Sequence, residues 1–239
     1  MAYTPTVWKN GEFPPIDAEH LNKIEQGIAN SAPGGFGLGT RSKWLTNADD
    51  LNNIYQGGFY FWYGDNIPAN APDGINYGGM IVMSRSATEF VQQVFNITDI
   101  PSLQNCMLVR TAYNNTWYPW EWVNPPMQLG IEYRTTEKYL GKPVYVKVVD
   151  CGHFAAAGTV KEIMVPDGNV EHMVGCTGRV GEWQIPATLF AGNPADAGDV
   201  RLEGRVDDSH HFYIYLYSKA YDLTTWQTIV TIKYTKTTD

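Results

Sequence analysis

Residues 211–217 alternate strictly between two kinds of side chain. The even positions are Phe212, Ile214 and Leu216, and the odd positions are His211, Tyr213, Tyr215 and Tyr217. Because successive side chains of a β-strand point to opposite faces, this period of two predicts a strand with one core face and one face lined by aromatic rings. An apolar row left in water is costly, so we expect these rings to meet another subunit, another sheet or a ligand.

The same alternation recurs elsewhere in the C-terminal half. Val144, Val146 and Val148 alternate with Tyr145 and Lys147, and Leu202, Gly204 and Val206 alternate with Arg201, Glu203 and Arg205. Patterns of helical period are scarce, whereas 23 Gly, 14 Pro and 13% aromatic residues suit short strands joined by turns. We therefore predict a mainly β protein, with half-buried antiparallel sheet in its C-terminal part.

The middle of the chain predicts a series of short strands. The runs cover residues 58–63, 79–84, 90–95, 107–113 and 116–123. Asn114 and Asn115 tolerate positive φ and predict a hairpin turn between the last two runs. Residues 49–55 are predicted to form a short helix.

One longer helix is predicted, over residues 17–28. Asp17 is a suitable N-cap, because its carboxylate can accept the unpaired amide hydrogens of the first turn. Leu21, Ile24 and Ile28 form one narrow apolar stripe on an otherwise polar surface. So short a helix is marginal alone in water, so we expect neighbouring chains or a docking surface to hold it. The alternative is that it packs on its own domain.

Two boundaries divide the chain into three parts. Residues 31–40 are rich in glycine and predict a linker, since they lack the spacing and the flanking strand and helix of a phosphate loop. Pro125 and Pro126 predict a second boundary, because consecutive prolines cannot continue the interior of a sheet. The predicted parts are an attachment segment (1–37), a small central module (38–126) and a C-terminal domain (127–239).

Composition argues against several classes of partner. With 17 basic and 25 acidic residues the net charge is -8, and no basic track is present to neutralise nucleic-acid phosphates. No segment approaches the roughly 20 apolar residues of a membrane span, and no signal peptide precedes the chain, so we expect a soluble protein without membrane insertion. Cys106, Cys151 and Cys176 lack close pairing and are expected to be free, buried thiols.

Metal-ligand and catalytic patterns are weak. Cys151, His153, His172 and Cys176 offer two thiols and two imidazoles as zinc ligands, but their spacing matches no zinc-finger pattern, so no metal is expected. Glycan hydrolysis requires a pair of carboxylates, and the candidates lie in predicted turns, where acidic residues are usually solvated: Glu182, Glu203, Asp207 and Asp208. Because serine, zinc and cysteine hydrolase motifs are also absent, we predict no enzyme and no cofactor, with a short glycan hydrolase as the remaining enzymatic alternative.

Aromatic residues are the better candidates for binding, because their flat faces stack on the C–H surfaces of sugar rings. The ligand-binding candidates are His211, Tyr213, Tyr215 and Trp183. A second set comprises Trp117, Tyr118, Trp120 and Trp122, which we expect to form the core of the central module, with sugar binding as the alternative. The tyrosine row is left open between a subunit interface and a ligand platform.

Three segments carry a family resemblance. Residues 3–28, from Tyr-Thr-Pro-Thr-Val-Trp to the helix stripe, resemble the start of phage and prophage tail-fibre and receptor-binding proteins. The sequence Asp-Leu-Asn-Asn-Ile at 50–54, with Gly58-Phe-Tyr, Gln92-Gln93, Arg110 and Trp-Tyr-Pro-Trp at 117–120, is similar to the knob modules of pyocin and phage tail fibres. Residues 141–150 and 231–236 resemble the C-terminal β-sandwich heads of such proteins, although Cys151 stands where similar heads tend to carry an aromatic residue.

The resemblance implies a small α+β or β knob followed by a jelly-roll-like antiparallel β-sandwich. It also implies a homotrimer, a place on the virion at the tail tip, attachment to a baseplate or tail protein, and adhesion to a host cell-surface polysaccharide. The alternative within the same class is a structural baseplate or tail adaptor that has no receptor site.

Overall fold

The structure is a computed structural model that describes residues 18–19, 21–24, 42–98, 100, 104–165, 169–185, 187–189, 198–219 and 221–238. Residues 18, 19 and 21–24 are helical, in agreement with the helix predicted over 17–28. Leu21 is exposed on this helix and Ile24 is partly buried. Ile28, Asp17 and the predicted linker lie outside the described residues.

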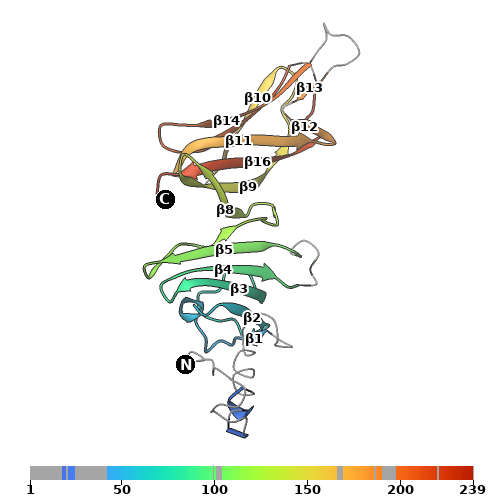
Figure 1. The fold of residues 1–239 in the computed structure, drawn as a ribbon. Helices are drawn as coiled ribbons and strands as arrows, with labels where there is room; N and C mark the ends of the chain where they lie inside the picture. Colours follow the sequence, from blue (N-terminus) through green and yellow to red (C-terminus); the bar gives the residue numbers. More distant parts are fainter. Residues whose placement is uncertain are drawn as a thin grey trace, which may run out of the picture. The chain divides into compact units, whose positions relative to one another are not determined.

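The chain forms two compact units (Figure 1). Unit 1 comprises residues 1–105 and 110–119, and unit 2 comprises residues 106–109 and 120–239. This division differs from the boundary predicted at Pro125 and Pro126. The reason is that Leu108 and Val109 pair with Trp122 and Glu121, so this short stretch associates with the strands of unit 2.

Unit 1 is built on a small sheet. Its strands, in spatial order, are β1 (Lys43–Trp44), β2 (Gly58–Tyr63), β3 (Tyr77–Ser86), β4 (Glu89–Asn96) and the later part of β5 (Met107–Tyr113), with β6 (Thr116–Trp117) also on β5. β1 pairs with β2 in parallel, and β2, β3 and β4 pair in antiparallel fashion. Asn114 and Asn115 have φ values of 49° and 62°, which confirms the predicted hairpin turn between β5 and β6.

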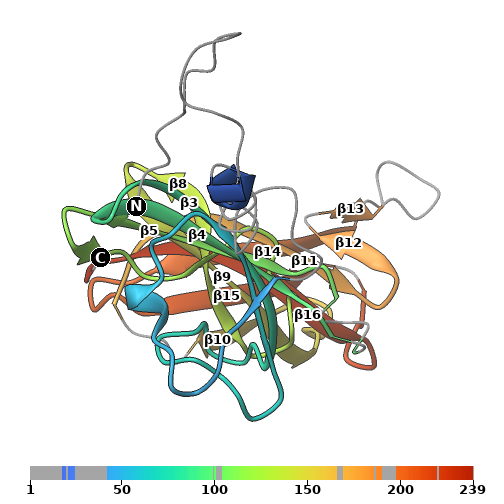
Figure 2. The ribbon, with the colours of Figure 1, turned by 60° about the horizontal axis from the view of Figure 1, so that its bottom comes forward.

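Two details differ from the sequence predictions. The run predicted at 116–123 is split into β6 and β7 (Glu121–Trp122), because Pro119 between them has no amide hydrogen to continue a ladder. The helix predicted at 49–55 is a single turn, η1 (Leu51–Asn53), which is visible in cyan in Figure 2. Asp50 caps this turn, since its Oδ1 accepts a 2.8 Å hydrogen bond from the amide of Asn52.

The sheet of unit 1 has one buried face. Alternate side chains of β2, β3 and β4 point into the core, and these include Tyr60, Trp62, Met80, Val82 and Val94. Residues of the segment between β1 and β2, among them Leu51, are buried as well. The intervening side chains of the same strands are partly or fully exposed.

Unit 2 is a sandwich of two sheets (Figure 1). The first sheet has the order β7, β8 (Glu132–Tyr139), β9 (Lys142–His153), β16 (Gln227–Lys236), β11 (Val170–Val180) and β12 (Trp183–Ile185). The second has the order β10 (Thr159–Val165), β15 (Phe212–Ser218), β14 (Gly198–Val206) and β13 (Ala187–Leu189). All pairings within the second sheet are antiparallel.

The core of unit 2 lies between these sheets. Phe212, Ile214 and Leu216 of β15 are fully buried and belong to one hydrophobic cluster with Val230 and Ile232 of β16. Such contacts between the inner faces of two sheets define a β-sandwich, so the mainly β fold with a C-terminal antiparallel sandwich is confirmed. Among the described residues, no helix is long and apolar enough to cross a membrane.

Candidate functional site

Strand β15 separates a core face from an aromatic outer face, as its sequence predicts. Its even residues from 212 to 216 have no exposed surface, whereas the three odd residues Tyr213, Tyr215 and Tyr217 are partly exposed. β15 lies between β10 and β14, so strands hydrogen-bond to both of its sides. The tyrosines therefore project from the middle of a sheet rather than from a loop.

The strand register places ordered rows of side chains across this outer face. The rows, written from β10 through β15 to β14, are Val160, Tyr217, Arg201; Glu162, Tyr215, Glu203; and Met164, Tyr213, Arg205. We call these nine side chains the tyrosine face. Each aromatic ring has one neighbour on either side. Of these six neighbours on β10 and β14, four are charged, and the other two are Val160 and Met164.

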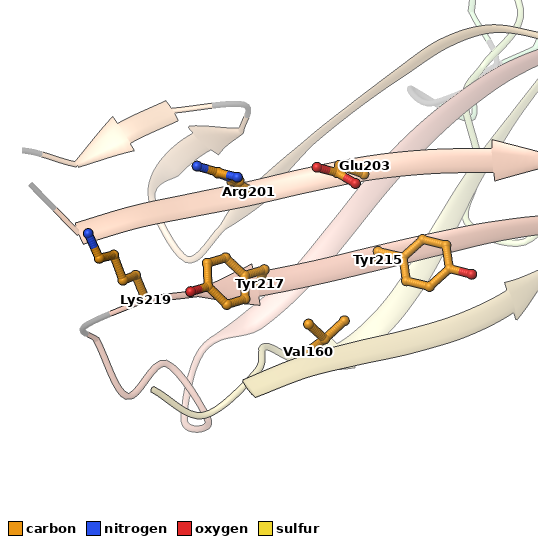
Figure 3. A pocket seen from close by; sticks show the side chains of 6 residues that line it. All are labelled: Val160, Arg201, Glu203, Tyr215, Tyr217 and Lys219. Carbon is orange, nitrogen blue, oxygen red and sulfur yellow. The ribbon is translucent and has the colours of Figure 1, made fainter. Parts of the chain in front are cut away.

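The rings of the tyrosine face are arranged as a stack. The centroids of Tyr213 and Tyr215 lie 6.3 Å apart with an angle of 29° between the rings. The guanidinium of Arg201 lies 6.0 Å from the ring centroid of Tyr217. An open groove of about 470 Å³ runs beside the rings (Figure 3), and it is lined by Val160, Arg201, Glu203, Tyr215, Tyr217 and Lys219.

The hydroxyl groups of two tyrosines remain protonated at neutral pH. Desolvation raises the pKa of Tyr215 above its usual value, and the charge of Glu162 and a hydrogen bond to its side chain add to the increase. Desolvation likewise raises the pKa of Tyr213, with Asp207 acting in the same direction through its charge and a hydrogen bond.

His211 lies in the turn that leads from β14 into β15. Its amide donates a 2.9 Å hydrogen bond to Oδ1 of Asp207, and its ring Nδ1 lies 3.4 Å from Oδ2 of the same carboxylate. The hydrogen bond from the His211 amide is the main reason why the pKa of Asp207 is lowered. Asp207 therefore connects two of the predicted ligand-binding residues, His211 and Tyr213.

Trp183, the remaining ligand-binding candidate, is not part of the tyrosine face. It lies on β12 in the other sheet, and its ring stacks on Trp226 with centroids 5.3 Å apart. Gly181, whose φ is +55°, leaves room for this pair, because a Cβ atom there would lie 1.9 Å from the Trp226 ring. Trp183 and Trp226 form a separate, partly exposed aromatic pair.

The aromatic residues at 117–122 do not form the core that the sequence suggested. Trp117, Trp120 and Trp122 are partly buried and Tyr118 is 53% exposed. Trp117 packs in unit 1 against Phe90, with ring centroids 5.0 Å apart, whereas Trp122 belongs to unit 2 and packs edge-on against Tyr133. The four residues are divided because the strand breaks at Pro119.

The cysteines and histidines are not grouped as ligands. Within the described ranges, no cluster of three or more His, Cys, Asp or Glu side chains is suited to a metal ion. Cys106, Cys151 and Cys176 are free thiols, the first two buried and the third partly buried. Burial raises the pKa of Cys151 to about 11 and that of Cys176 to about 12, so both are protonated at neutral pH.

Sequence reasoning found the tyrosines but missed the residues beside them. The sequence does not single out Val160, Glu162 or Lys219 as members of a site, and it shows Arg201 only as part of an alternating strand. The alternation of side chains in the sequence identifies the outward positions of each strand. It does not identify which strands are neighbours, and the groove forms only because β10 and β14 flank β15.

Comparisons with known proteins give distant likenesses only. No protein-family profile and no curated protein matches the chain. Among solved structures, it is similar to the Pseudomonas aeruginosa R1 pyocin fibre comprising C-terminal residues 323–701, with 12% identity, 87% of this chain and 69% of that chain covered, and a TM-score of 0.31. It is also similar to an N-truncated R2-type pyocin tail fibre, with 12% identity, 82% and 98% covered, and a TM-score of 0.30.

Both likenesses are to tail fibres, the class of protein that the sequence motifs resemble. At this identity and these TM-scores they assign neither the site nor its ligand. The function is therefore inferred from the geometry of the described residues.

Proposed function

We propose that this chain is the adhesion subunit of a phage tail fibre, and that its tyrosine face binds a host cell-surface polysaccharide. The observation that carries the proposal is the stack of Tyr213 and Tyr215 beside an open groove that contains both charged and aromatic side chains. Tyrosine rings offer flat apolar contact to the C–H faces of sugars at low cost in side-chain entropy.

The polar part of the face suits the hydroxyl groups of a sugar. Glu203, Arg201 and Lys219 line the groove and supply both acceptors and donors. Ligand sites in proteins combine apolar walls with a few placed polar groups in this way. Because the groove is partly open rather than enclosed, it suits one stretch of a longer polymer better than a small molecule surrounded on all sides.

The proposed assembly is a homotrimer on the virion. The resemblance of residues 3–28 to tail-fibre attachment segments supports docking of this end on a baseplate or tail protein, with Leu21, Ile24 and Ile28 as its apolar stripe. Three faces on each fibre and several fibres on each particle raise the overall avidity without new contacts, so a weak individual site suffices.

A glycan hydrolase is the second candidate, because Glu162 and Glu203 flank Tyr215 on the two neighbouring strands. Two interstrand spacings of about 4.8 Å separate their backbones by roughly 10 Å. The carboxylates lie on one open sheet face rather than on opposite sides of a cleft that could hold a glycosidic bond between them. Binding without cleavage therefore fits the geometry better.

The test is binding of the purified full chain to intact bacterial cells and to a panel of purified cell-surface polysaccharides. We expect at least one polysaccharide to bind, and Tyr215→Ala to weaken that binding about tenfold, the loss of one aromatic stacking contact. Tyr118→Ala, which removes an exposed tyrosine of unit 1, is the matched control and should leave binding unchanged.

Each other outcome favours a different function. Absence of binding to every strain and polysaccharide would favour the adaptor without a receptor site. Release of soluble sugar fragments, abolished by Glu162→Gln or Glu203→Gln, would establish the hydrolase. Binding that Tyr215→Ala leaves intact would move the receptor site away from the tyrosine face.

A further inference from the structure

The outward face of the sheet in unit 1 is apolar over most of its width. The side chains that point away from the core on β1 to β4, together with Ile97 directly after β4, are Trp44, Phe59, Phe61, Tyr63, Tyr77, Ile81, Met83, Val91, Gln93, Phe95 and Ile97. We call this set the outer apolar face. Gln93 is the one polar side chain of this set, and the charged outward residues of the same strands, Arg85 and Glu89, lie together at the end of the face.

This face is continuous rather than a scatter of single residues. The strand register places Phe59 beside Ile81, and Tyr63 beside Tyr77. The ring of Trp44 stacks on those of Phe61 and Tyr63, with centroids 6.2 Å and 5.1 Å apart. Gly79 lies opposite Phe61, and the side chain of Ile97 covers it, since a Cβ atom on Gly79 would lie 2.8 Å from the Ile97 Cδ1 atom.

The exposed area is larger than a soluble monomer usually tolerates. Trp44, Tyr63 and Tyr77 are 47%, 45% and 47% exposed. With about 150–250 Å² for each aromatic side chain, these three alone leave roughly 200–350 Å² of ring surface in water. Met83 and Ile97 are more than half exposed as well, so the whole face exceeds the few hundred Å² at which an apolar patch signals an interaction site.

We propose that the outer apolar face of unit 1 is the surface through which copies of this chain associate with one another. Interfaces between copies are depleted in charged residues at their centre and enriched in Trp, Tyr, Phe and Met, which is the composition of this face. The face is bordered at one end by a polar contact, the Arg85–Glu89 ion pair at the hairpin that joins β3 and β4. An apolar centre with a polar rim is the usual anatomy of such an interface.

The charge of the chain also favours a second copy as the occupant. Each copy carries a net charge of -8, so association of copies is opposed least where the contact surface brings no like charges close together. The outer apolar face meets this condition. The tyrosine face carries Glu162, Glu203, Arg201 and Arg205, all of which would have to be paired or desolvated in a contact between copies. The inference rests on the proposed assembly of copies but not on the polysaccharide ligand.

Light scattering coupled to gel filtration tests the inference on the full chain. The wild-type protein should have a mass that is a multiple of 26.8 kDa. Met83→Glu and Ile97→Glu each place a carboxylate on an already exposed position of the face, and each should convert the assembly to 26.8 kDa chains or raise its dissociation constant at least tenfold. Circular dichroism in the near ultraviolet and thermal unfolding check that the variants stay folded.

Leu140→Glu is the matched control, because Leu140 is an exposed apolar residue in the turn between β8 and β9 of unit 2. This variant should keep the wild-type mass. A monomeric wild-type protein would overturn the inference and the proposed assembly together. An assembly that both Glu variants leave intact would overturn the inference alone. An assembly of the expected mass that binds no polysaccharide would contradict the proposed function and leave this inference standing.

Discussion

Arg110 Nε donates a 2.9 Å hydrogen bond to Oε1 of Gln92 inside the core of unit 1, where both side chains are almost completely buried. The amide of Gln92 in turn donates to the carbonyl oxygens of Leu51 and Ile54, at 2.6 Å and 2.9 Å. The ring of Trp117 lies 3.9 Å from the guanidinium carbon. This network therefore holds the turn η1 against the sheet. It depends on the guanidinium of Arg110, a charged group buried in an apolar core.

Arg110→Ala should destabilise unit 1 strongly. Burial lowers the pKa of Arg110 to about 10, with Asp50 opposing the shift, so the guanidinium is still charged at neutral pH. Its removal deprives the buried Oε1 of Gln92 of this donor and leaves a cavity beside Trp117, at a cost of about 3 kcal/mol in the free energy of unfolding. Denaturant unfolding followed by tryptophan fluorescence measures the loss.

Arg85→Ala is the control for this prediction, because the Arg85 side chain is 82% exposed and pairs with Glu89 on the surface. Its cost should stay below about 1 kcal/mol. Equal effects of the two substitutions would mean that the buried network contributes nothing beyond an ordinary surface ion pair.

Gly78→Ala should also destabilise unit 1. A Cβ atom at this position would lie 2.1 Å from the ring of Trp62, which is buried and held by a 3.0 Å hydrogen bond from Nε1 to the carbonyl oxygen of Ile75. The ring cannot withdraw without losing this bond, so we expect a loss of about 1–3 kcal/mol and a lower melting temperature. Gly57→Ala meets no atom closer than 3.6 Å and serves as the comparison; a melting temperature of Gly78→Ala equal to that of Gly57→Ala would contradict the prediction.

Alkaline pH should destabilise unit 2 through its thiols. Burial raises the pKa of Cys151 to about 11 and that of Cys176 to about 12 in the folded chain, above the value of 9.0 for an exposed thiol. The unfolded chain therefore loses these protons first, and the stability that the neutral thiols contribute is complete below pH 9 and declines as pH rises toward 11 and 12. The decline should reach about 1 kcal/mol for each thiol near pH 10.

Urea unfolding at pH 7 and pH 10 measures this dependence. Because tyrosines also titrate in this range, the informative comparison is with Cys151→Ala and Cys176→Ala, whose stability should fall less between the two pH values. An identical decline in wild type and both variants would show that the thiols are not responsible. Slow alkylation of Cys151 in the native protein at pH 8 is expected for the same reason.

The sequence predicted local features well where a single strand decides them. The alternation of Phe212, Ile214 and Leu216 with three tyrosines identified both faces of β15, and Asn114 with Asn115 identified a hairpin, because each pattern reflects backbone geometry within a few residues. These signals do not depend on the rest of the chain.

Features that depend on pairing between distant strands were not predictable. Glu162 and Glu203 are far apart in sequence and become neighbours of Tyr215 only through the order β10, β15, β14. Trp183 looked equivalent to the tyrosines as a binding residue, yet it lies on the other sheet. The tryptophans at 117–122 looked like one core because they are close in sequence, and Pro119 separates them. Aromatic composition alone does not distinguish core, interface and ligand contact.

The alternation along β15 also separates two structural roles. Phe212, Ile214 and Leu216 belong to the core between the sheets, whereas the side chains at 213, 215 and 217 and their neighbours on β10 and β14 lie on the outward face. Substitutions at the outward positions can therefore change the surface that the strand presents while the packing that holds the strand is kept. On the proposed adhesion function, specificity changes by exchanging a few side chains on a constant scaffold.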